Sequence, residues 1–495
     1  MYLVNCSIAL AGGVLWVLSR GLRRKLEGLR DVVGRDKVYS DPAIVRLYAR
    51  EPSGAQVFPE NTAVAFPESV EDVSKIVRYA YKNDIYIYPQ GSTSSLVGGA
   101  VPDKEGVVIS FQRMNRILDV RVVDSYVDVE PGVRLGDLNL ELARYGYMFP
   151  IDPGSVSVAT VGGAVNTGAG GLRGAKYGTT RDWVLGLTVV LPDEQGSVLR
   201  IGCRTLKCRQ GYDLTRLIVG SEGTLAIVVE ATLKITPVPE NVVTALGFYD
   251  DLRSLSNTVV EIKSSGVQPM ILEFMDDKSA RAAAEAINAP IKPEGHMLLA
   301  GIDVNREATD RFVKWLSDIM RRNGARKVYT ARTLEEAEEK KLFEIRRNLF
   351  PAQVKVASKF VRPGSKLIVY IEDIAVPPSR LPEAVERLRE LEEKYRLVGL
   401  LGGHIGDGNL HPIVGFPADD EDMKARVSEW YEEVMKIALE LGGTISSEHG
   451  IGTFKRKGLE MELSHLGSLK ALELMRGIKR VFDPKGLLNP GKVVG

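Results

Sequence analysis

Apolar residues recur along the chain with two different periods, and these periods predict its helices and strands. Residues 68–82 follow Pro67 and repeat apolar side chains every three or four positions, which predicts an amphipathic helix. Its apolar positions are Val70, Val73, Ile76, Val77 and Ala80. Short apolar runs rich in β-branched residues predict strands in the first half. These strands are expected at residues 85–88, 106–110, 126–130, 185–191 and 224–235.

Glycine interrupts this pattern in one region. Residues 91–178 contain 15 of the 49 glycines, and eight of these fall between Gly154 and Gly178. Such a stretch is too rich in glycine for stable helix interiors, so we expect short strands joined by loops. Loops of this kind allow the backbone to approach a ligand closely.

The second half alternates strands with charged amphipathic helices. Strands are expected at residues 243–248, 297–304 and 367–372, and helices at 310–323, 333–349, 382–394, 421–441 and 464–482. The pattern of expected strands and helices changes near residues 237–239, which contain two prolines. The sequence therefore predicts an α+β protein in two parts, with the first ending at about this point.

Composition excludes several classes of protein. The chain has 495 residues, 65 Lys and Arg against 64 Asp and Glu, and a net charge of +1, so no global basic field exists to hold nucleic acid. Three cysteines cannot form a disulfide framework or a four-thiolate cluster. The C-x4-C spacing of Cys203 and Cys208 is neither a redox nor a zinc motif, so we expect a reduced, intracellular protein.

The N-terminus is apolar and then basic. Residues 1–19 carry no charge, and Arg20, Arg23, Arg24 and Lys25 follow. This segment is short for a membrane span, and we expect no stable span. The alternatives are a membrane anchor, whose basic cluster would keep the rest of the chain in the cytoplasm, or a wrongly assigned start.

Common nucleotide and hydrolase motifs are missing. The chain contains no G-x-G-x-x-G, no G-x-x-x-x-G-K-[ST], no H-E-x-x-H and no G-x-S-x-G. Two other segments have the composition of a phosphate-binding loop: residues 90–95, after an expected strand, and the glycine-rich residues 162–171. Each alone is equally compatible with a surface loop. Together they favour a large ligand that carries a pyrophosphate.

The histidines are few and clustered. The chain has five, none before residue 296, and three of them lie in Gly403–His411 and Ser447–Gly452. Asp407-Gly408 between two apolar runs predicts a two-residue hairpin turn that pairs His404 with His411 and places Asn409 on the same face. These imidazoles could share a metal ion with Glu448 as third ligand. A hydrogen-bonded histidine pair that packs a sheet is the alternative.

Many ordered motifs resemble the FAD-linked oxidases of the vanillyl-alcohol oxidase and p-cresol methylhydroxylase superfamily. Within it the chain is most similar to the group of cytochrome-type D-lactate dehydrogenase and the glycolate oxidase catalytic subunit. The motifs are PQGSTSSLVGGAVP (89–102), ISFQRMNRI (109–117), VEPGV (129–133), TVGGAVNTGAGG (160–171), YGTTRDWVLGLTVVLPD (177–193), LIVGSEGTLAIVVEATLKITP (217–237), GGHIGDGNLHP (402–412), SSEHGIG (446–452) and FDPKGLLNPGK (482–492).

The resemblance implies three regions: an N-terminal extension (1–27), a two-lobed FAD-binding domain (28–237) and a substrate-capping domain with an antiparallel sheet (238–495). It implies that residues 91–95 hold the FAD pyrophosphate and that others line FAD. The implied FAD residues are Gly91, Ser92, Thr93, Ser94, Ser95, Asp152, Gly162, Gly163, Asn166, Gly168, Gly171, Tyr177, Gly178, Glu222, Gly223 and Asn489. Some members attach FAD through a histidine of this domain, and this chain has none there, so we expect non-covalent FAD.

The resemblance also implies oxidation of a D-2-hydroxy acid of the D-lactate or glycolate class. His404, His411 and Glu448 match positions that bind a divalent metal, for which Zn or Mn is expected. His449 matches the catalytic base, Asn409 is expected to orient the substrate, and Arg346 matches the clamp of the substrate carboxylate, with Arg347 as its alternative.

Partners follow from the same chemistry. The chain has no haem motif and too few cysteines for a cluster, so an external acceptor must take the electrons: a cytochrome, a quinone, an iron–sulfur subunit, another flavoprotein or oxygen. We expect a cytoplasmic protein, at the inner face of the membrane if it contacts one, and a homodimer is one option. The alternatives are a transferase similar to alkylglycerone-phosphate synthase and a non-catalytic FAD-binding subunit of a glycolate-oxidase-type complex.

Overall fold

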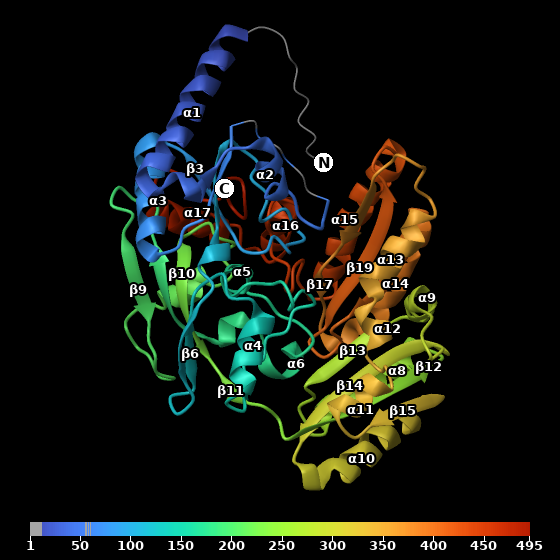
Figure 1. Ribbon diagram of the computed structural model, residues 1–495. Coiled ribbons are helices and arrows are strands. Elements are labelled where there is room, and N and C mark those ends of the chain that lie inside the picture. The colour runs from blue at the N-terminus through green and yellow to red at the C-terminus, as the bar shows by residue number, and fades with distance from the viewer. Residues whose placement is uncertain (1–11, 55–56, 58, 60) are drawn as a thin grey trace.

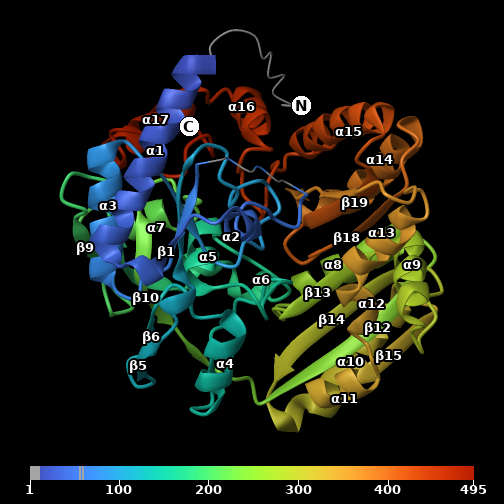
Figure 2. The same ribbon diagram turned by 45° about the horizontal axis from the view of Figure 1, so that its top comes forward.

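The computed structural model describes residues 12–54, 57, 59 and 61–495 and contains three main sheets surrounded by helices (Figure 1). Two smaller sheets lie in the first half of the chain, and one large antiparallel sheet lies in the second half (Figure 2). The expected α+β class is confirmed.

The first sheet carries the segment that leads into residues 91–95. In spatial order it consists of β1 (Val38–Tyr39), β2 (Ala63–Ala65), β4 (Gly106–Ser110) and β3 (Tyr86–Gln90). Strands β2 and β3 both pair in parallel with β4, so residues 91–95 leave the sheet at the carboxyl end of β3. Helix α3 (Val70–Asn83) packs its predicted apolar side on this sheet, and the Ser69 hydroxyl accepts the Asp72 N–H at its start.

The N-terminal helix α1 (Gly12–Val33) crosses the expected boundary at residue 27. Leu26, Leu29 and Val33 are buried against α3. No helix among the described residues combines the length and the apolar character that a membrane crossing needs. Residues 1–11 of the expected extension lie outside the described part of the chain.

The second sheet is antiparallel and completes the first half. In spatial order its strands are β5 (Ile117–Arg121), β6 (Tyr126–Val129), β10 (Ile227–Lys234), β8 (Val184–Val190) and β9 (Val198–Gly202). A core between this sheet and the helices α4 (Leu135–Ala143) and α5 (Val161–Thr167) contains buried Leu138, Val165 and Val228. The strands expected in this region are confirmed.

The expectation of strands and loops in the glycine-rich segment is wrong at two places. Residues Val161–Thr167 form α5, and Gly174–Tyr177 form the single turn α6. The Thr160 hydroxyl accepts the Gly163 N–H at 3.3 Å and starts α5. A Cβ on Gly162 would lie 2.7 Å from the Cβ of Pro131. Close packing against neighbouring backbone therefore outweighs the low helix propensity of glycine.

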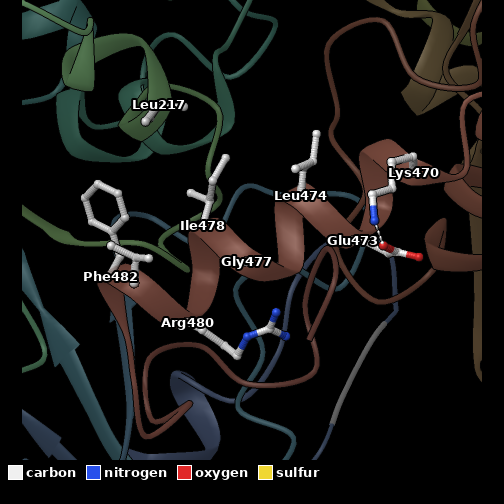
Figure 3. Close-up of a pocket in the computed structure, with 9 residues that line it drawn as sticks. Leu217, Lys470, Glu473, Leu474, Gly477, Ile478, Arg480 and Phe482 are labelled. Atoms are coloured by element: carbon white, nitrogen blue, oxygen red, sulfur yellow. Dashed lines mark hydrogen bonds and ion pairs between the residues drawn. The ribbon is translucent and has the colours of Figure 1, made fainter.

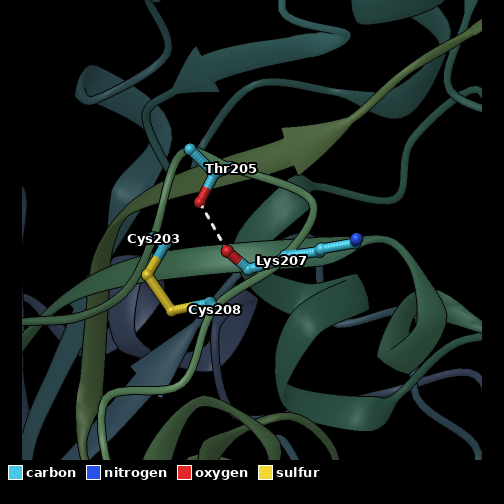
Figure 4. The surroundings of a disulfide bond; sticks show 4 residues. All are labelled: Cys203, Thr205, Lys207 and Cys208. Atoms are coloured by element: carbon cyan, nitrogen blue, oxygen red, sulfur yellow. Dashed lines mark hydrogen bonds between the residues drawn. A yellow bond between two sulfur atoms is a disulfide. The ribbon is translucent and has the colours of Figure 1, made fainter.

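The expectation of reduced cysteines is also wrong for two of the three. Cys203 and Cys208 form a disulfide in the loop after β9 (Figure 4). Within the loop, the Thr205 hydroxyl donates to the Lys207 carbonyl oxygen at 2.8 Å. The short C-x4-C spacing matches no known motif but allows the chain to turn back on itself and bring the two sulfurs together.

The large sheet dominates the second half. In spatial order its strands are β15 (Lys327–Ala331), β12 (Asn241–Tyr249), β14 (His296–Val304), β13 (Ile271–Met275), β18 (Gly399–Gly403), β19 (Asn409–Pro417) and β16 (Leu367–Ile371), and β17 (Ile374–Ala375) pairs with β19. Every pairing is antiparallel. Helices cover both faces of the sheet: α8 (Leu252–Ser264), α10 (Thr309–Arg322), α14 (Leu381–Lys394) and α15 (Glu421–Glu440) one face, α9 (Asp277–Ile287) and α13 (Leu349–Ser358) the other.

Two helices that the pattern predicts as continuous are interrupted. Residues 333–349 form α11 (Leu334–Glu339) and α12 (Glu344–Arg347), separated near Lys341 with φ +59°. Residues 464–482 contain the end of α16 (Arg456–His465) and then α17 (Lys470–Phe482), separated at Gly467 with φ +64°. Apolar periodicity continues across both breaks, and only the local backbone reveals them.

The C-terminal segment returns to the first half of the chain. Leu488 forms a parallel bridge with Ile87 of β3 and belongs to the core of the first sheet. Ile478 and Phe482 of α17 pack against the core of the second sheet. The red C-terminal helices accordingly lie against the blue and green lobe in both views (Figures 1 and 2).

Replacing Gly91 with alanine is expected to lower the free energy of unfolding by about 1–3 kcal/mol. An added Cβ would lie 2.2 Å from the Thr160 hydroxyl oxygen, where residues 91–95 approach the start of α5. Gly154→Ala is the matched control, because a Cβ there would meet no heavy atom of the described residues within 4 Å. Chemical denaturation measures both, and equal stability of the two variants would contradict this close approach.

Candidate active site

The histidine hairpin forms, but the predicted register is wrong by two residues. His411 pairs with Gly402 rather than with His404. The His404 carbonyl oxygen accepts the Asn409 N–H at 3.2 Å, so residues 405–408 form the loop instead of a two-residue turn. Within Asp407-Gly408 only Gly408 has a positive φ, +89°, whereas the predicted turn needs two.

A tertiary contact explains the longer loop. Gly406 donates its N–H to the Leu272 carbonyl oxygen of β13 at 3.2 Å, and a Cβ on Gly406 would lie 2.6 Å from the Cβ of Ala175. A shift of two residues keeps side chains on the same face of a sheet. The rings of His404 and His411 therefore remain neighbours, with centroids 5.4 Å apart.

Glu448 completes a group of three donor atoms. Its Oε1 lies 3.5 Å from His404 Nε2 and 3.3 Å from His411 Nε2. The opposite nitrogens are occupied: His404 Nδ1 lies 2.7 Å from Glu273 Oε1, and His411 Nδ1 lies 3.3 Å from the Glu372 carbonyl oxygen. Two imidazole nitrogens and a carboxylate oxygen thus converge, and each histidine is oriented by a second contact. This donor set fits a divalent ion such as Zn or Mn.

Electrostatics link these three residues. Burial alone would raise the pKa of Glu448, but the facing His404 and His411 hold this pKa well below its ordinary value. Burial alone would lower the pKa of His404, but Glu273 and Glu448 raise this pKa well above its ordinary value. His404 therefore lies between two carboxylates, Glu273 and Glu448, which favour a positive charge there.

His449 stands beside the three donors as a half-buried imidazole. Its ring stacks on His411 with a centroid distance of 5.0 Å and an interplanar angle of 13°. Burial lowers the pKa of His449 to about 4, against an opposing effect of Asp373. Its Nδ1 is buried and has no hydrogen-bond partner among the described residues. An uncharged imidazole with an unoccupied nitrogen can accept a proton.

Asp373 is a neighbour that the sequence did not single out. Donor atoms of Asp373, His411, Glu448 and His449 all lie within 4.8 Å of one another, which is an alternative ligand set to one that includes His404. We favour His404, because Asp373 Oδ1 already accepts the Asn409 side-chain amide at 2.7 Å. Its Oδ2 accepts the backbone N–H groups of residues 447–449.

Arg346 and Arg347 occupy different environments. Arg346 Nε lies 2.7 Å from Glu273 Oε2, and its side chain is 12% exposed. Arg347 pairs with Glu338 at 2.7 Å on the surface, where both side chains are about half exposed. Only Arg346 thus approaches the histidine cluster. Glu273, which contacts both Arg346 and His404, is the second residue that sequence reasoning missed.

Asn409 serves as scaffold in this structure. It is 1% exposed, and its amide nitrogen donates to Asp373 Oδ1 at 2.7 Å and to the Ile374 carbonyl oxygen at 3.0 Å. Its Oδ1 has no hydrogen-bond partner in the described part of the chain. That oxygen is buried as well, so Asn409 supports the backbone around the site in this structure.

The predicted pyrophosphate loop and the glycine-rich segment lie together. Gly91 faces Thr160 and Gly163, and within the loop Thr93 has φ +54° and the hydroxyls of Ser92 and Ser94 lie 3.3 Å apart. Backbone amides and small hydroxyls at the carboxyl end of a strand suit a phosphate group.

Other predicted FAD residues join this group through Glu222. The Glu222 N–H donates to the Asn166 carbonyl oxygen at 2.7 Å, and the Asn489 amide donates to the Glu222 carbonyl oxygen at 2.7 Å. Gly168 lies against Gly220, and Gly223 lies near the Asn166 side chain. A Cβ on Gly99 would lie 3.3 Å from both Ser95 Oγ and Glu222 Oε2, so Ser95 lies near Glu222. Gly162 packs closely against Pro131.

A second group of predicted FAD residues lies toward the histidines. Asp152 pairs with Arg173 at 3.2 Å, and burial raises the pKa of Asp152 to about 6. A Cβ on Gly171 would lie 2.2 Å from the Asp152 carbonyl oxygen, while Tyr177 and Gly178 end the short helix α6. A Cβ on Gly170 would lie 2.9 Å from Glu448 Oε2. The glycine-rich segment therefore lies directly against Glu448, one of the three candidate metal ligands.

One groove of the surface lies elsewhere. It has a volume of about 550 Å³ and runs along α17, beside Leu217 of α7 (Leu214–Ile218). Figure 3 shows Leu474 and Ile478 on the side of α17 that faces Leu217. None of its lining residues belongs to the predicted FAD, metal or base residues.

Family models match both parts of the chain. A model of an FAD binding domain matches residues 61–202, and a model described as FAD linked oxidases, C-terminal domain, matches residues 238–493. Solved structures share the fold. Substrate-bound p-cresol methylhydroxylase is similar with a TM-score of 0.77 at 17% identity, over 96% of this chain and 97% of that one. Alkyldihydroxyacetonephosphate synthase is similar with a TM-score of 0.71 at 19% identity, over 94% of this chain and 84% of that one.

Curated relatives are similar along nearly their whole length. The chain is 36% identical over 433 residues to the glycolate oxidase subunit GlcD of Bacillus subtilis (strain 168), covering 87% of this chain and 88% of that protein. It is 35% identical over 437 residues to a D-lactate dehydrogenase of Archaeoglobus fulgidus, covering 88% and 92%. These matches show that the chain belongs to the family of FAD-linked oxidases.

Proposed function

We propose that this protein oxidises a D-2-hydroxy acid of the D-lactate or glycolate class to the 2-oxo acid. Bound FAD would supply the hydride acceptor for this oxidation, and an external acceptor would then reoxidise it. The observation that carries the proposal is the group of His404, His411, Glu448 and His449, which lies directly against the glycine-rich segment of an FAD-linked oxidase. The names of the glycolate oxidase and D-lactate dehydrogenase relatives support the substrate class.

Each residue has a distinct part in this reaction. The Arg346 guanidinium pairs with the substrate carboxylate through its terminal nitrogens, while Glu273 holds Nε. His449 accepts the C2 hydroxyl proton at Nδ1, the nitrogen that is buried without a partner in the described chain. His404, His411 and Glu448 would hold a divalent ion, Zn or Mn. When bound, the metal lowers the pKa of the hydroxyl and FAD accepts the hydride from C2.

FAD is held without a covalent bond to histidine in its own domain. All five histidines of the chain lie at or after residue 296, beyond the FAD-binding half. Residues 91–95 and α5 provide the phosphate contacts, and the segments near Glu222 and Asn489 complete the binding site. The division into an extension (1–27), an FAD domain (28–237) and a capping domain (238–495) is part of this proposal.

The electrons leave for a separate protein or small acceptor. With three cysteines and no C-x-x-C-H, the chain lacks a c-type haem motif and the thiolates of a four-cysteine cluster. A cytochrome, a quinone, an iron–sulfur subunit, another flavoprotein or oxygen can fill this role. The proposed location is the cytoplasm, at the inner face of the membrane if the protein contacts one.

The transferase alternative is not favoured. The likeness to alkyldihydroxyacetonephosphate synthase at 19% identity is evidence for the fold alone. A non-catalytic FAD-binding subunit has no need of the buried donor group and the adjacent base. Both alternatives predict that hydroxy acids leave the flavin oxidised.

Under nitrogen, D-lactate is expected to bleach the visible flavin band of the purified protein, whereas L-lactate is not. The transfer of a hydride to the flavin removes this absorption, and the fixed positions of Arg346 and His449 accept one enantiomer. Glycolate and longer D-2-hydroxy acids, measured in the same way, establish the chain length that is preferred. A flavin band that no D-2-hydroxy acid bleaches, in protein loaded with Zn or Mn, would refute the proposed function.

His449→Gln is expected to slow flavin reduction about 10²–10⁴-fold, because the proton acceptor is lost. The FAD content should stay equal to that of the wild type, since the histidine is not among the residues proposed to hold FAD. His296→Gln is a matched control: His296 also lies half-buried in the capping domain but accepts the Asp277 N–H outside the site. Stopped-flow absorbance follows the reduction, and equal rates for both variants would exclude His449 as the base.

Glu273→Gln is expected to weaken Mn²⁺ binding about 10–100-fold, because the carboxylate that orients His404 is lost. Electron paramagnetic resonance of free Mn²⁺ measures the affinity of the apoprotein directly. Glu392→Gln removes another buried carboxylate of the same domain, which pairs with Lys278 at 3.2 Å, and should leave the affinity unchanged. An unchanged affinity in Glu273→Gln would show that His404 needs no such support.

A further inference from the structure

Two buried carboxylates hold the segment that carries Glu448 and His449, here termed the active-site loop (residues 446–452). Asp373, between β16 and β17, holds its first half. Asp373 Oδ2 accepts the N–H groups of Ser447, Glu448 and His449 at 2.9, 2.9 and 2.8 Å. The Ser446 hydroxyl donates to the same oxygen at 3.0 Å. A single carboxylate oxygen thus fixes the backbone of Glu448, the third candidate metal ligand, and of His449, the proposed base.

Glu222 holds the second half from the other side. It comes from the FAD-binding half of the chain, 229 residues away from its first partner. Its Oε1 accepts the Ile451 N–H at 2.6 Å, and its Oε2 accepts the Gly452 N–H at 2.7 Å. Gly450 between the two anchors has φ +90°, and a Cβ on it would lie 2.7 Å from Glu222 Oε1. The loop is therefore held from both parts of the molecule.

The backbone of Glu222 belongs to the proposed FAD site. Its N–H and carbonyl groups bond to Asn166 and Asn489, which come from the glycine-rich helix and from the C-terminal segment. Glu222 adopts φ +54°, a conformation that a side chain disfavours and that neighbouring contacts must enforce. One residue thus connects two segments of the proposed FAD site to the active-site loop.

Neither carboxylate is replaceable by its amide without loss. Each oxygen of Glu222 accepts one N–H, whereas glutamine has one acceptor oxygen and an NH2 group that would face an N–H. Asp373 similarly accepts from four donors at Oδ2 and from Asn409 at Oδ1. Both side chains are buried, with 8% exposure for Glu222 and 0% for Asp373, so water cannot take over these contacts.

We propose that Asp373 and Glu222 are positioning residues that together set Glu448 and His449 against the bound flavin. Asp373 fixes the donor and the base within the capping domain. Glu222 transmits the position of the FAD-lining segments to the same loop. The inference rests on the proposed function for its catalytic consequence. The hydrogen bonds from the active-site loop to Asp373 and Glu222 are a property of the folded chain.

The test compares Glu222→Gln, Asp373→Asn and the control Glu130→Gln in the full-length FAD-loaded protein. Glu130 is also a buried carboxylate that accepts a backbone N–H, from Arg116 at 2.7 Å, but it does not touch the active-site loop. Hydrogen–deuterium exchange should show the amides of residues 451 and 452 exchanging about 10-fold faster in Glu222→Gln, and those of 447–449 in Asp373→Asn. Glu130→Gln should leave all five unchanged.

The functional readouts separate positioning from simple destabilisation. Mn²⁺ affinity of the apoprotein should fall about 10-fold in Asp373→Asn, because Glu448 loses its fixed position. In Glu222→Gln the limiting rate of flavin reduction should fall about 10-fold with an unchanged dissociation constant for D-lactate, because Arg346 lies outside the loop. FAD content should be the same in Asp373→Asn and Glu130→Gln as in the wild type, and the rates of Glu222→Gln are compared at saturating FAD.

Three results would overturn the proposal or separate it from the proposed function. Unchanged exchange at residues 447–452 in both variants would show that the two carboxylates do not hold the active-site loop. Faster exchange with unchanged Mn²⁺ affinity and unchanged flavin reduction would reduce the two carboxylates to structural residues and refute positioning. If the wild type itself reduces no flavin with any D-2-hydroxy acid, the proposed function fails. Exchange together with Mn²⁺ affinity still shows whether Asp373 and Glu222 position the active-site loop.

Discussion

The burial of negative charge constrains this site more than any other factor. A carboxylate can leave water only where N–H donors or cations surround it. Glu372 meets this condition through Lys455 Nζ at 2.6 Å, and both side chains are fully buried. Lys455 also donates to the carbonyl oxygens of Asp373 and Ile445 at 2.9 and 2.6 Å. This ion pair therefore fixes the backbone on both sides of the residues that carry the chemistry.

The same constraint explains the state of Asp373. Burial would raise the pKa of its carboxyl, but His449, Lys455 and His411 hold this pKa below its ordinary value. Because it stays ionised, it can accept four hydrogen bonds at a single oxygen and align three successive N–H groups of the loop. The chain thereby replaces the usual rigid support of a helix or strand with one buried anion.

Much of the fold was predictable from the sequence, because strand runs such as residues 106–110 and 297–304 carry their own local signal. The adjacency of His404 and His411 was predictable for the same reason, since only their register depended on distant contacts of Gly406. Glu273 and Asp373 were not predictable. Their roles arise from partners more than 70 residues away, and neither stands in a motif with a recognisable spacing.

Charge balance around the three histidines supports the proposed divalent metal and anionic substrate. Glu273, Glu448 and Asp373 lie within 3.9 Å of histidine nitrogens, and in the described part of the chain Arg346 is the only Lys or Arg that forms a salt bridge with one of them. Once His404 and His411 serve as neutral metal ligands, three carboxylates against one guanidinium leave two negative charges in this space. Such an excess would repel a carboxylate substrate and is costly in a low dielectric. A divalent cation at His404, His411 and Glu448 would cancel this excess, so that the anionic substrate would meet a site without net negative charge beside Arg346.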